Sequence, residues 1–252
     1  MVPVKNPSIS VDCVVFGFDG TSLKVLLVKR GYRERQPDGQ TVLREDVKLP
    51  GSPIYQDEDV SSSAYRILEE MTNLKQVYLK QLQVFSDPDR IGDDDLGWLN
   101  ETYGFETRRI ISIAYYSRVK LSPKIISHTA MRRAEWHDVQ SVKRLALDHK
   151  AILMTALKTL STQLANEPIA FELLPRKFTI RQLQNLYEAI LGIEIDNRNF
   201  RKKILGSGYL EPLQEREKGV AHKPAQYYQF NRHAYERETR LKSKLNFINW
   251  HD

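Results

Sequence analysis

The chain has little cysteine and no long hydrophobic run. Cys13 is its only cysteine, which excludes an internal disulfide and a zinc site built from several thiolates. No apolar stretch approaches the roughly 20 residues of a membrane-spanning helix, and the opening residues MVPVKNPSIS lack the apolar core of a signal peptide. We therefore expect a cytoplasmic protein with no membrane partner.

The remaining composition is that of a folded globular protein. Of 252 residues, 41% are hydrophobic and 28% are charged, and the length suits one large or two ordinary domains. The net charge of +6 by itself favours polyanionic partners only weakly. Residues 176–203, however, hold seven basic and three acidic side chains. This local excess needs its own explanation.

The first third of the chain favours a sheet. β-rich runs cover residues 8–18 and 24–29, and Asp19-Gly20 between them indicates a hairpin. Residues 31–46 are polar and charged, which predicts a loop.

A helix and further strands follow. The spacing of apolar residues predicts a helix over 60–72 with one buried face. Residues 78–85 and 109–119 are strand-like, and the polar segment 91–106 between them is expected to be an irregular insertion. The apolar face of the helix consists of Ala64, Ile67, Leu68 and Met71.

Helices dominate the last hundred residues. Asp148 is expected to cap a helix that runs to about residue 165, and a short strand is expected over 169–174. Two helices and a hairpin come next. This change of pattern places a domain boundary near residue 148, giving domains 1–148 and 149–252.

Residues 52–74 carry an incomplete motif. Their sequence, SPIYQDEDVSSSAYRILEEMTNL, resembles the Nudix signature G-x5-E-x7-R-E-U-x-E-E-x-G-U, which forms a loop, a helix and a second loop. Glu58, Arg66 and Glu70 fall on matching positions of the signature without a gap. Leu68 and Leu74 fall on its apolar positions.

The departures from this signature concern its chemistry. Ile67 and Met71 replace two glutamates, and Ser52 and Asn73 replace two glycines. Nudix enzymes use such carboxylates to hold Mg²⁺ or Mn²⁺ against a diphosphate. Isoleucine and methionine cannot bind a hard cation, so we expect no catalytic residue, no metal site and no cofactor. The glutamates and the arginine that persist are expected to tie the loop to the helix.

Motifs around this box extend the resemblance over nearly the whole chain. They are VLLVKRG, LPGS, VFSDPDR, IISIAYYSRV, LDH and LPRKFT, in this order. Together with the box, they make the chain resemble the Nudix-related transcription regulators often called NrtR, and most of all their arabinose-utilisation branch. The resemblance implies an α+β protein, in which a Nudix-like α/β/α sandwich is followed by a winged helix-turn-helix domain.

The second half predicts a DNA-reading unit. Thr179 and Gln182 form a T-x-x-Q capping box for a helix that ends at Gly192. Asp196 caps a second helix, NRNFRKKIL, whose exposed face presents basic and amide side chains suited to bases and phosphates. Strands at 209–213 and 226–230 form a wing. The predicted DNA-binding residues are Arg176, Lys177, Thr179, Arg198, Asn199, Arg201, Lys202, Lys218 and Lys223.

The resemblance implies a homodimeric regulator that binds a palindromic DNA operator, and we expect it to be a repressor. A small molecule bound in the Nudix-like domain would control its DNA binding. Loss of the metal carboxylates and of the glycine at position 52 favours a sugar effector, with L-arabinose preferred. The candidate effector-binding residues are Arg30, Lys48, Glu58, Asp89 and Arg90.

Three alternatives stay open at this point. The first is an ADP-ribose-responsive regulator of NAD metabolism, and the second is a divergent Nudix pyrophosphohydrolase. The third keeps the winged helix but gives it a protein partner.

Overall fold

The computed structural model describes residues 3–36, 38–104, 106–221 and 223–237. Its larger part contains a mixed sheet of seven strands, in which β3, β2, β1, β6 and β5 lie in that order, β4 pairs with β1 and β7 pairs with β2. β1 and β6 are parallel, and the other pairs are antiparallel. The strands are β1 (Lys5–Phe18), β2 (Leu23–Arg35), β3 (Thr41–Lys48), β4 (Gly51–Tyr55), β5 (Lys80–Phe85), β6 (Ile111–Lys120) and β7 (Ala134–Asp138).

The central strand β1 is buried on both faces. Val14 and Phe16 point into one apolar core, whereas Val11, Cys13 and Val15 point into another. Such alternation between two cores requires helices on both sides of the sheet. Cys13 is therefore a core residue, as its apolar surroundings predict.

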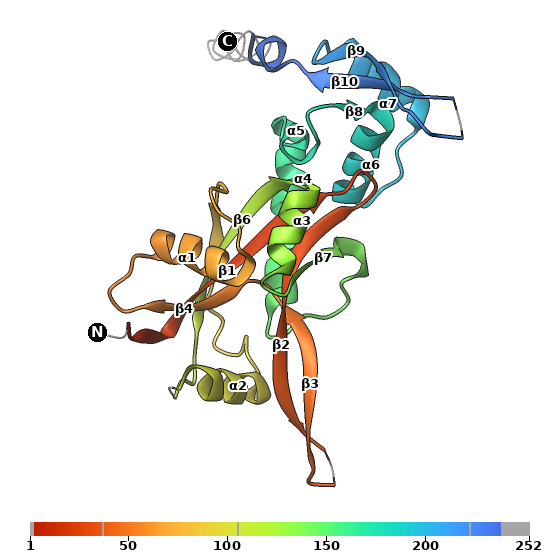
Figure 1. Cartoon of the computed structure of the whole chain (residues 1–252). Helices are drawn as coiled ribbons and strands as arrows, with labels where there is room; N and C mark the ends of the chain where they lie inside the picture. The colour runs from red at the N-terminus through yellow and green to blue at the C-terminus, as the bar shows by residue number, and fades with distance from the viewer. Residues whose placement is uncertain (1–2, 37, 105, 222, 238–252) are drawn as a thin grey trace.

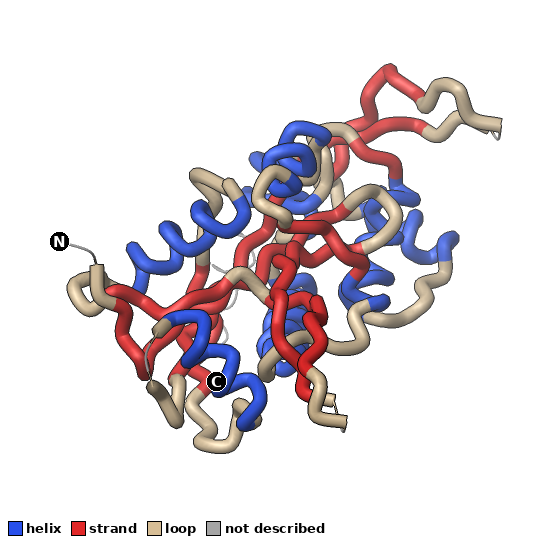
Figure 2. The backbone as a smooth tube through the Cα atoms, turned by 60° about the horizontal axis from the view of Figure 1, so that its bottom comes forward, coloured by secondary structure: helices blue, strands red, loops and turns tan. Residues whose placement is uncertain are grey.

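Helices cover both faces, as Figure 2 shows for the strands of the larger sheet. On one face lie α1 (Val60–Thr72) and α3 (Pro123–Ala130), and on the other lies α4 (His149–Asn166). α1 occupies the predicted range and buries the predicted face. The predicted α/β/α sandwich is thereby confirmed. The short helix η1 (Val139–Ser141) follows β7.

The prediction of a loop for residues 31–46 is wrong. β2 and β3 pair as far as Arg35 and Thr41, so this segment is a long hairpin, which extends away from the body as an arm in Figure 1. Most described side chains toward its end are exposed. A strand solvated on both faces needs no alternation of apolar and polar residues, which explains why the pattern missed it.

The irregular insertion predicted for residues 91–106 is also wrong, because it contains α2 (Asp93–Tyr103). Leu99 is its one buried apolar residue among those described. A helix that buries so little has no strong apolar period. Gly104, with φ of 70°, ends it.

The last third of the described chain is a winged helix domain (Figure 1). The capping box of Thr179 and Gln182 begins α6, Gly192 ends it, and the Asp196 side chain caps α7, all as predicted. Residues 170–173 are helical, so the short strand predicted for 169–174 is wrong. A short apolar run suits either structure. The elements are α5 (Ala170–Leu173), β8 (Phe178–Thr179), α6 (Ile180–Leu191), α7 (Asn197–Gly206), β9 (Leu210–Arg216) and β10 (Gln226–Phe230).

One apolar core joins the two halves of the chain. It contains Phe16 from the sheet, Leu160 from α4 and Leu186 from α6. α4 therefore packs against both the sheet and the winged helix. The boundary at residue 148 stays a prediction. None of the helices in the described ranges combines the length and hydrophobicity that crossing a membrane requires.

Candidate functional site

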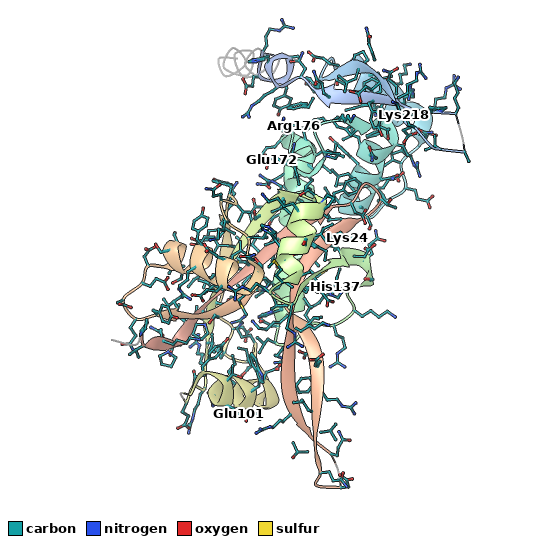
Figure 3. The ribbon with its side chains drawn as sticks, viewed as in Figure 1. Lys24, Glu101, His137, Glu172, Arg176 and Lys218 are labelled. Carbon is teal, nitrogen blue, oxygen red and sulfur yellow. The ribbon has the colours of Figure 1, made fainter. Side chains whose placement is uncertain are left out.

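Two adjacent cavities lie at the base of the β2–β3 arm. The larger, of about 1170 Å³, is bounded by the arm, α2, β7 and residues 144–147. Pockets for small molecules and cofactors measure roughly 300–1,000 Å³, so this cavity can hold a nucleotide-sized ligand. Its lining includes Glu101 and His137, both labelled in Figure 3.

The smaller cavity has a free volume of about 20 Å³. A buried water needs about 10–15 Å³, so the smaller cavity has room for little more than water. Trp98 and Leu147 line both cavities and form the wall between them. A ligand bound against Trp98 or Leu147 in the larger cavity would therefore touch the wall of the smaller one.

A buried polar cluster closes the floor of the smaller cavity. The Leu49 amide donates to His149 Nδ1 at 2.9 Å, so His149 Nε2 carries the proton that faces Asp12 Oδ1 at 3.2 Å. Burial alone would raise the pKa of Asp12, but His149 outweighs it, with help from Lys48 and Ser112, and the pKa is lowered. Asp12 is therefore a carboxylate.

Lys48 lies beside this carboxylate and is 4% exposed. Its Nζ donates to the carbonyl oxygens of Gly51 at 2.6 Å and Leu49 at 3.3 Å. Burial lowers the pKa of Lys48 to about 8, although the nearby Asp12 carboxylate opposes the shift. At neutral pH the cluster therefore still contains a charged lysine.

Arg30 lines the larger cavity and is held on three sides. Its guanidinium binds Asp46 through two nitrogens, at 2.9 and 2.6 Å, and Asp95 at 2.5 Å. It also lies 4.8 Å from the centre of the Trp98 ring, within cation–π range. Arg30 thereby fixes both the arm and α2 at the cavity wall.

Arg90 lines the smaller cavity and binds the start of α4. Its Nε and Nη2 donate to the Asp148 carboxylate at 2.7 and 2.5 Å, and its Nη1 donates to the Ile110 carbonyl at 3.1 Å. Asp148 is the N-cap residue of α4 by position, as predicted, but its side chain makes no capping bond to the helix. The ion pair has taken the carboxylate that the cap would use.

Glu58 and Asp89 line neither cavity. Glu58 binds Arg66 through two bonds, at 2.8 and 2.6 Å, and Arg66 also reaches Glu70 at 3.1 Å. The hydrogen bond from Arg66 lowers the pKa of Glu58. These residues tie the loop to α1, as the sequence indicates, and Asp89 is exposed.

The signature helix is apolar where Nudix enzymes bind metal. Ile67 is fully buried in the core, and Met71 packs against it. Within the described residues, no three His, Cys, Asp or Glu side chains are grouped so that they could hold a metal ion.

The glycine substitutions have different structural meanings. Asn73 ends α1 in the left-handed conformation, with φ of 61°, and so does the work of the signature glycine. Ser52 lines the smaller cavity beside Gly51, where a Cβ atom would lie 1.7 Å from the Asp12 carboxylate. The close backbone approach therefore occurs at residue 51.

Of the five predicted effector residues, the structure brings Lys48 and Arg90 to one cavity and Arg30 to the adjoining one. Two aromatic residues of α2 that line the cavities, Trp98 and Tyr103, were missed because the sequence predicted an irregular segment there. It also missed Leu147, which no sequence pattern marks.

The exposed face of α7 is a candidate DNA interface. Its four predicted residues are all exposed, whereas Phe200 and Ile204 pack toward the core, as the helical spacing predicts. A basic helix beside a wing suits the phosphates and base edges of a duplex. The four exposed residues are Arg198, Asn199, Arg201 and Lys202.

The other predicted DNA contacts differ in availability. Arg176 and Lys218 are exposed in the winged helix domain and labelled in Figure 3, and Lys223 is exposed in the wing. Lys177 is paired with Glu215, whose hydrogen bond raises the pKa of the lysine. Thr179 is 2% exposed, and its side chain caps α6. Their contacts with DNA stay predictions.

Comparisons with known proteins agree with this architecture. Residues 170–230 match the family model of the NrtR DNA-binding winged helix domain. The chain is 27% identical over 237 residues to the ADPR responsive transcriptional repressor NtrR of Acinetobacter baylyi, covering 92% of this chain and 85% of that protein.

Solved structures share the fold. Shewanella oneidensis NrtR complexed with a 27mer DNA gives a TM-score of 0.60 at 22% identity, covering 90% of this chain and 95% of that one. A MutT/nudix family protein from Enterococcus faecalis gives a TM-score of 0.57 at 22% identity, covering 92% and 89%.

These findings support a likeness to NrtR-like, Nudix-associated winged helix regulators, with a Nudix-like domain followed by a winged helix domain. They give no support to the arabinose-utilisation branch that the sequence motifs favour.

Proposed function

We propose that this chain is a DNA-binding transcriptional repressor whose Nudix-like domain binds ADP-ribose and does not hydrolyse it. The observation that carries the proposal is the pairing of a winged helix, with an exposed basic α7, and a Nudix-like domain whose signature helix buries Ile67 in place of a metal-binding carboxylate. The relative from Acinetobacter baylyi is described as ADPR responsive.

ADP-ribose suits the cavities better than L-arabinose does. A volume of about 1170 Å³ greatly exceeds what a single pentose fills. Trp98 and Tyr32 offer aromatic surfaces to a base, and Arg33 and Arg144, which line the same cavity, are cations that a diphosphate requires. The absence of glycine at position 52 gives no support to a sugar, because the close backbone approach occurs at Gly51.

A homodimer on a palindromic operator completes the proposal. A winged helix reads a short half-site, and two copies related by a twofold axis read two half-sites.

The test is DNA binding with and without ligand. Duplexes that the full chain retains from a random pool serve as the probe, and fluorescence anisotropy measures Kd at fixed salt. We expect ADP-ribose to change the Kd by about 5–150-fold, the usual range of coupling between sites, and L-arabinose to leave it unchanged. A response to the pentose alone, or to neither compound, contradicts the assignment.

A pair of double variants tests the DNA face. Replacing Arg198 and Lys202 with alanine removes two charges from α7, and we expect weaker binding with a smaller salt slope. Replacing Lys75 and Lys80 with alanine removes the same charge from the Nudix-like domain and should leave binding unchanged. Equal losses in both variants would mean that only the net charge matters.

A further inference from the structure

We propose that Leu147 and the Arg90–Asp148 ion pair form a latch that passes occupancy of the larger cavity to α4, and through α4 to the winged helix. The latch is defined by these three residues, and the inference rests on the proposed function. It assigns the route of regulation for that site.

Leu147 is held in an unusual backbone conformation. Its φ is 58°, in the left-handed region that residues other than glycine and asparagine rarely adopt. It lines both cavities, and it directly precedes the N-cap of α4. Strained residues persist only where surrounding contacts hold them. A ligand that displaces Leu147 therefore releases strain at the first turn of α4.

The contacts that hold this conformation lie on both sides of Leu147. The Ala146 amide donates to the Val47 carbonyl of β3 at 3.0 Å, and Asp148 is bound by Arg90. The ion pair is well shielded, since the side chains of Arg90 and Asp148 are 6% and 14% exposed.

Asp148 has two possible partners for its carboxylate. It now binds Arg90, and its side chain makes no bond to the amides that begin α4. An aspartate at the N-cap ordinarily accepts such a bond. When a ligand in the larger cavity moves Leu147, the backbone beside Asp148 shifts and the carboxylate can turn from Arg90 to the helix. The latch thus has an Arg90-bound arrangement and a capped arrangement.

α4 carries the difference to the DNA-reading unit. Ile152 and Leu153, near its start, are fully buried in the core that also holds Leu183 and Leu186 of α6. Packed cores do not deform continuously, so a small shift of α4 moves α6 as a body.

Four variants of the full chain test the latch. Asp148→Asn keeps a good capping side chain but removes the charge that binds Arg90. Leu147→Gly removes the strain and the side chain, whereas Leu147→Ala removes the side chain and keeps the strain. Glu172→Gln is the control, because it breaks the Arg118–Glu172 pair between β6 and α5, away from both cavities.

The readouts are the DNA Kd with and without saturating ADP-ribose and the calorimetric Kd of ADP-ribose. We expect ligand-free Asp148→Asn to bind DNA as ligand-saturated wild type does, with no further response to ADP-ribose. Leu147→Gly should favour the Arg90-bound arrangement and need about fivefold more ADP-ribose than Leu147→Ala for half response. Glu172→Gln should behave as wild type.

The outcomes separate the latch from the proposed function. If wild type ignores ADP-ribose, the proposed function fails, and the latch fails with it. If wild type responds but ligand-free Asp148→Asn binds DNA as ligand-free wild type does and responds fully, the latch alone is wrong. A Glu172→Gln variant that loses its response would also overturn the latch. If thermal unfolding shows that Asp148→Asn is not folded, the two Leu147 variants decide, and equal responses from them refute the latch.

Discussion

At the scale of single residues, the ionisable groups buried beneath the cavities are all partnered. Asp12 receives hydrogen bonds from His149 and Ser112, and Lys48 donates to backbone carbonyls. A buried charge without such partners would cost several kcal/mol. The same partners hold the floor of the cavity in one arrangement, whatever ligand lies above it.

Lys48 gives the unfolding free energy a predictable pH dependence. Its folded pKa is about 8, and its ordinary value is 10.5. Below pH 8 the lysine is charged in both states. Between these values the unfolded chain binds the proton that the folded chain has lost, so this contribution to stability rises with pH and levels off above pH 10.5.

The measurement compares wild type with Lys48→Met in urea titrations from pH 7 to 11, a range of about four units that spans both values. We expect the unfolding free energy of wild type to gain on that of the variant as the pH rises. The exposed Lys75, replaced in the same way, provides the control. A wild-type advantage that stays flat across this window would show that the pKa of Lys48 is not lowered.

Sequence reasoning at this scale identified residue types better than residue roles. Lys48 ends β3, Arg90 follows β5 and Arg30 lies within β2, and these positions bring their charged side chains to the cavities. Leu147 and Trp98 could not be found, because a positive φ and a shared wall arise only from the assembled fold.

At the scale of elements, α1 shows how a signature helix can keep its shape without its chemistry. Its apolar period was legible in the sequence, and so was its range over residues 60–72. The β2–β3 arm and α2 were not, because neither buries a regular apolar face. Elements that obtain their stability from a neighbour rather than from their own pattern escape prediction.

This reading of α1 predicts different costs for restoring its two lost carboxylates. Ile67→Glu would bury an unpaired charge in the core and should lower the unfolding free energy by about 4 kcal/mol or more. Met71→Glu, at a partly buried position, should cost much less. Urea titration at neutral pH measures both. Equal costs would show that residue 67 can still present a carboxylate to solvent.

At the scale of the whole molecule, the two-domain order and the fold class followed from the sequence. The motifs before and after residue 148 named the two units, and the capping residues placed α6 and α7. The proposed effector did not follow, because the size of ligand that fits depends on the volume of a cavity that the arm and α2 enclose together.

The proposed dimer leads to a prediction about assembly on DNA. Sedimentation equilibrium should give a mass of twice 29.3 kDa. On DNA, one dimer should occupy two half-sites whose centres are separated along the duplex by about 34–36 Å or a multiple of that distance. Shifting one half-site by about half a helical turn should abolish tight binding. A monomer that keeps full affinity on a single half-site would refute the dimer.

The core shared by the sheet, α4 and α6 has a consequence for protein engineering. A fragment cut at residue 148 would expose the apolar stripe of α4 that now rests on β1, and the fragment left behind would expose the matching face of the sheet. Grafting this DNA-reading half onto another sensor would therefore succeed only if the recipient sheet offered the same surface to α4.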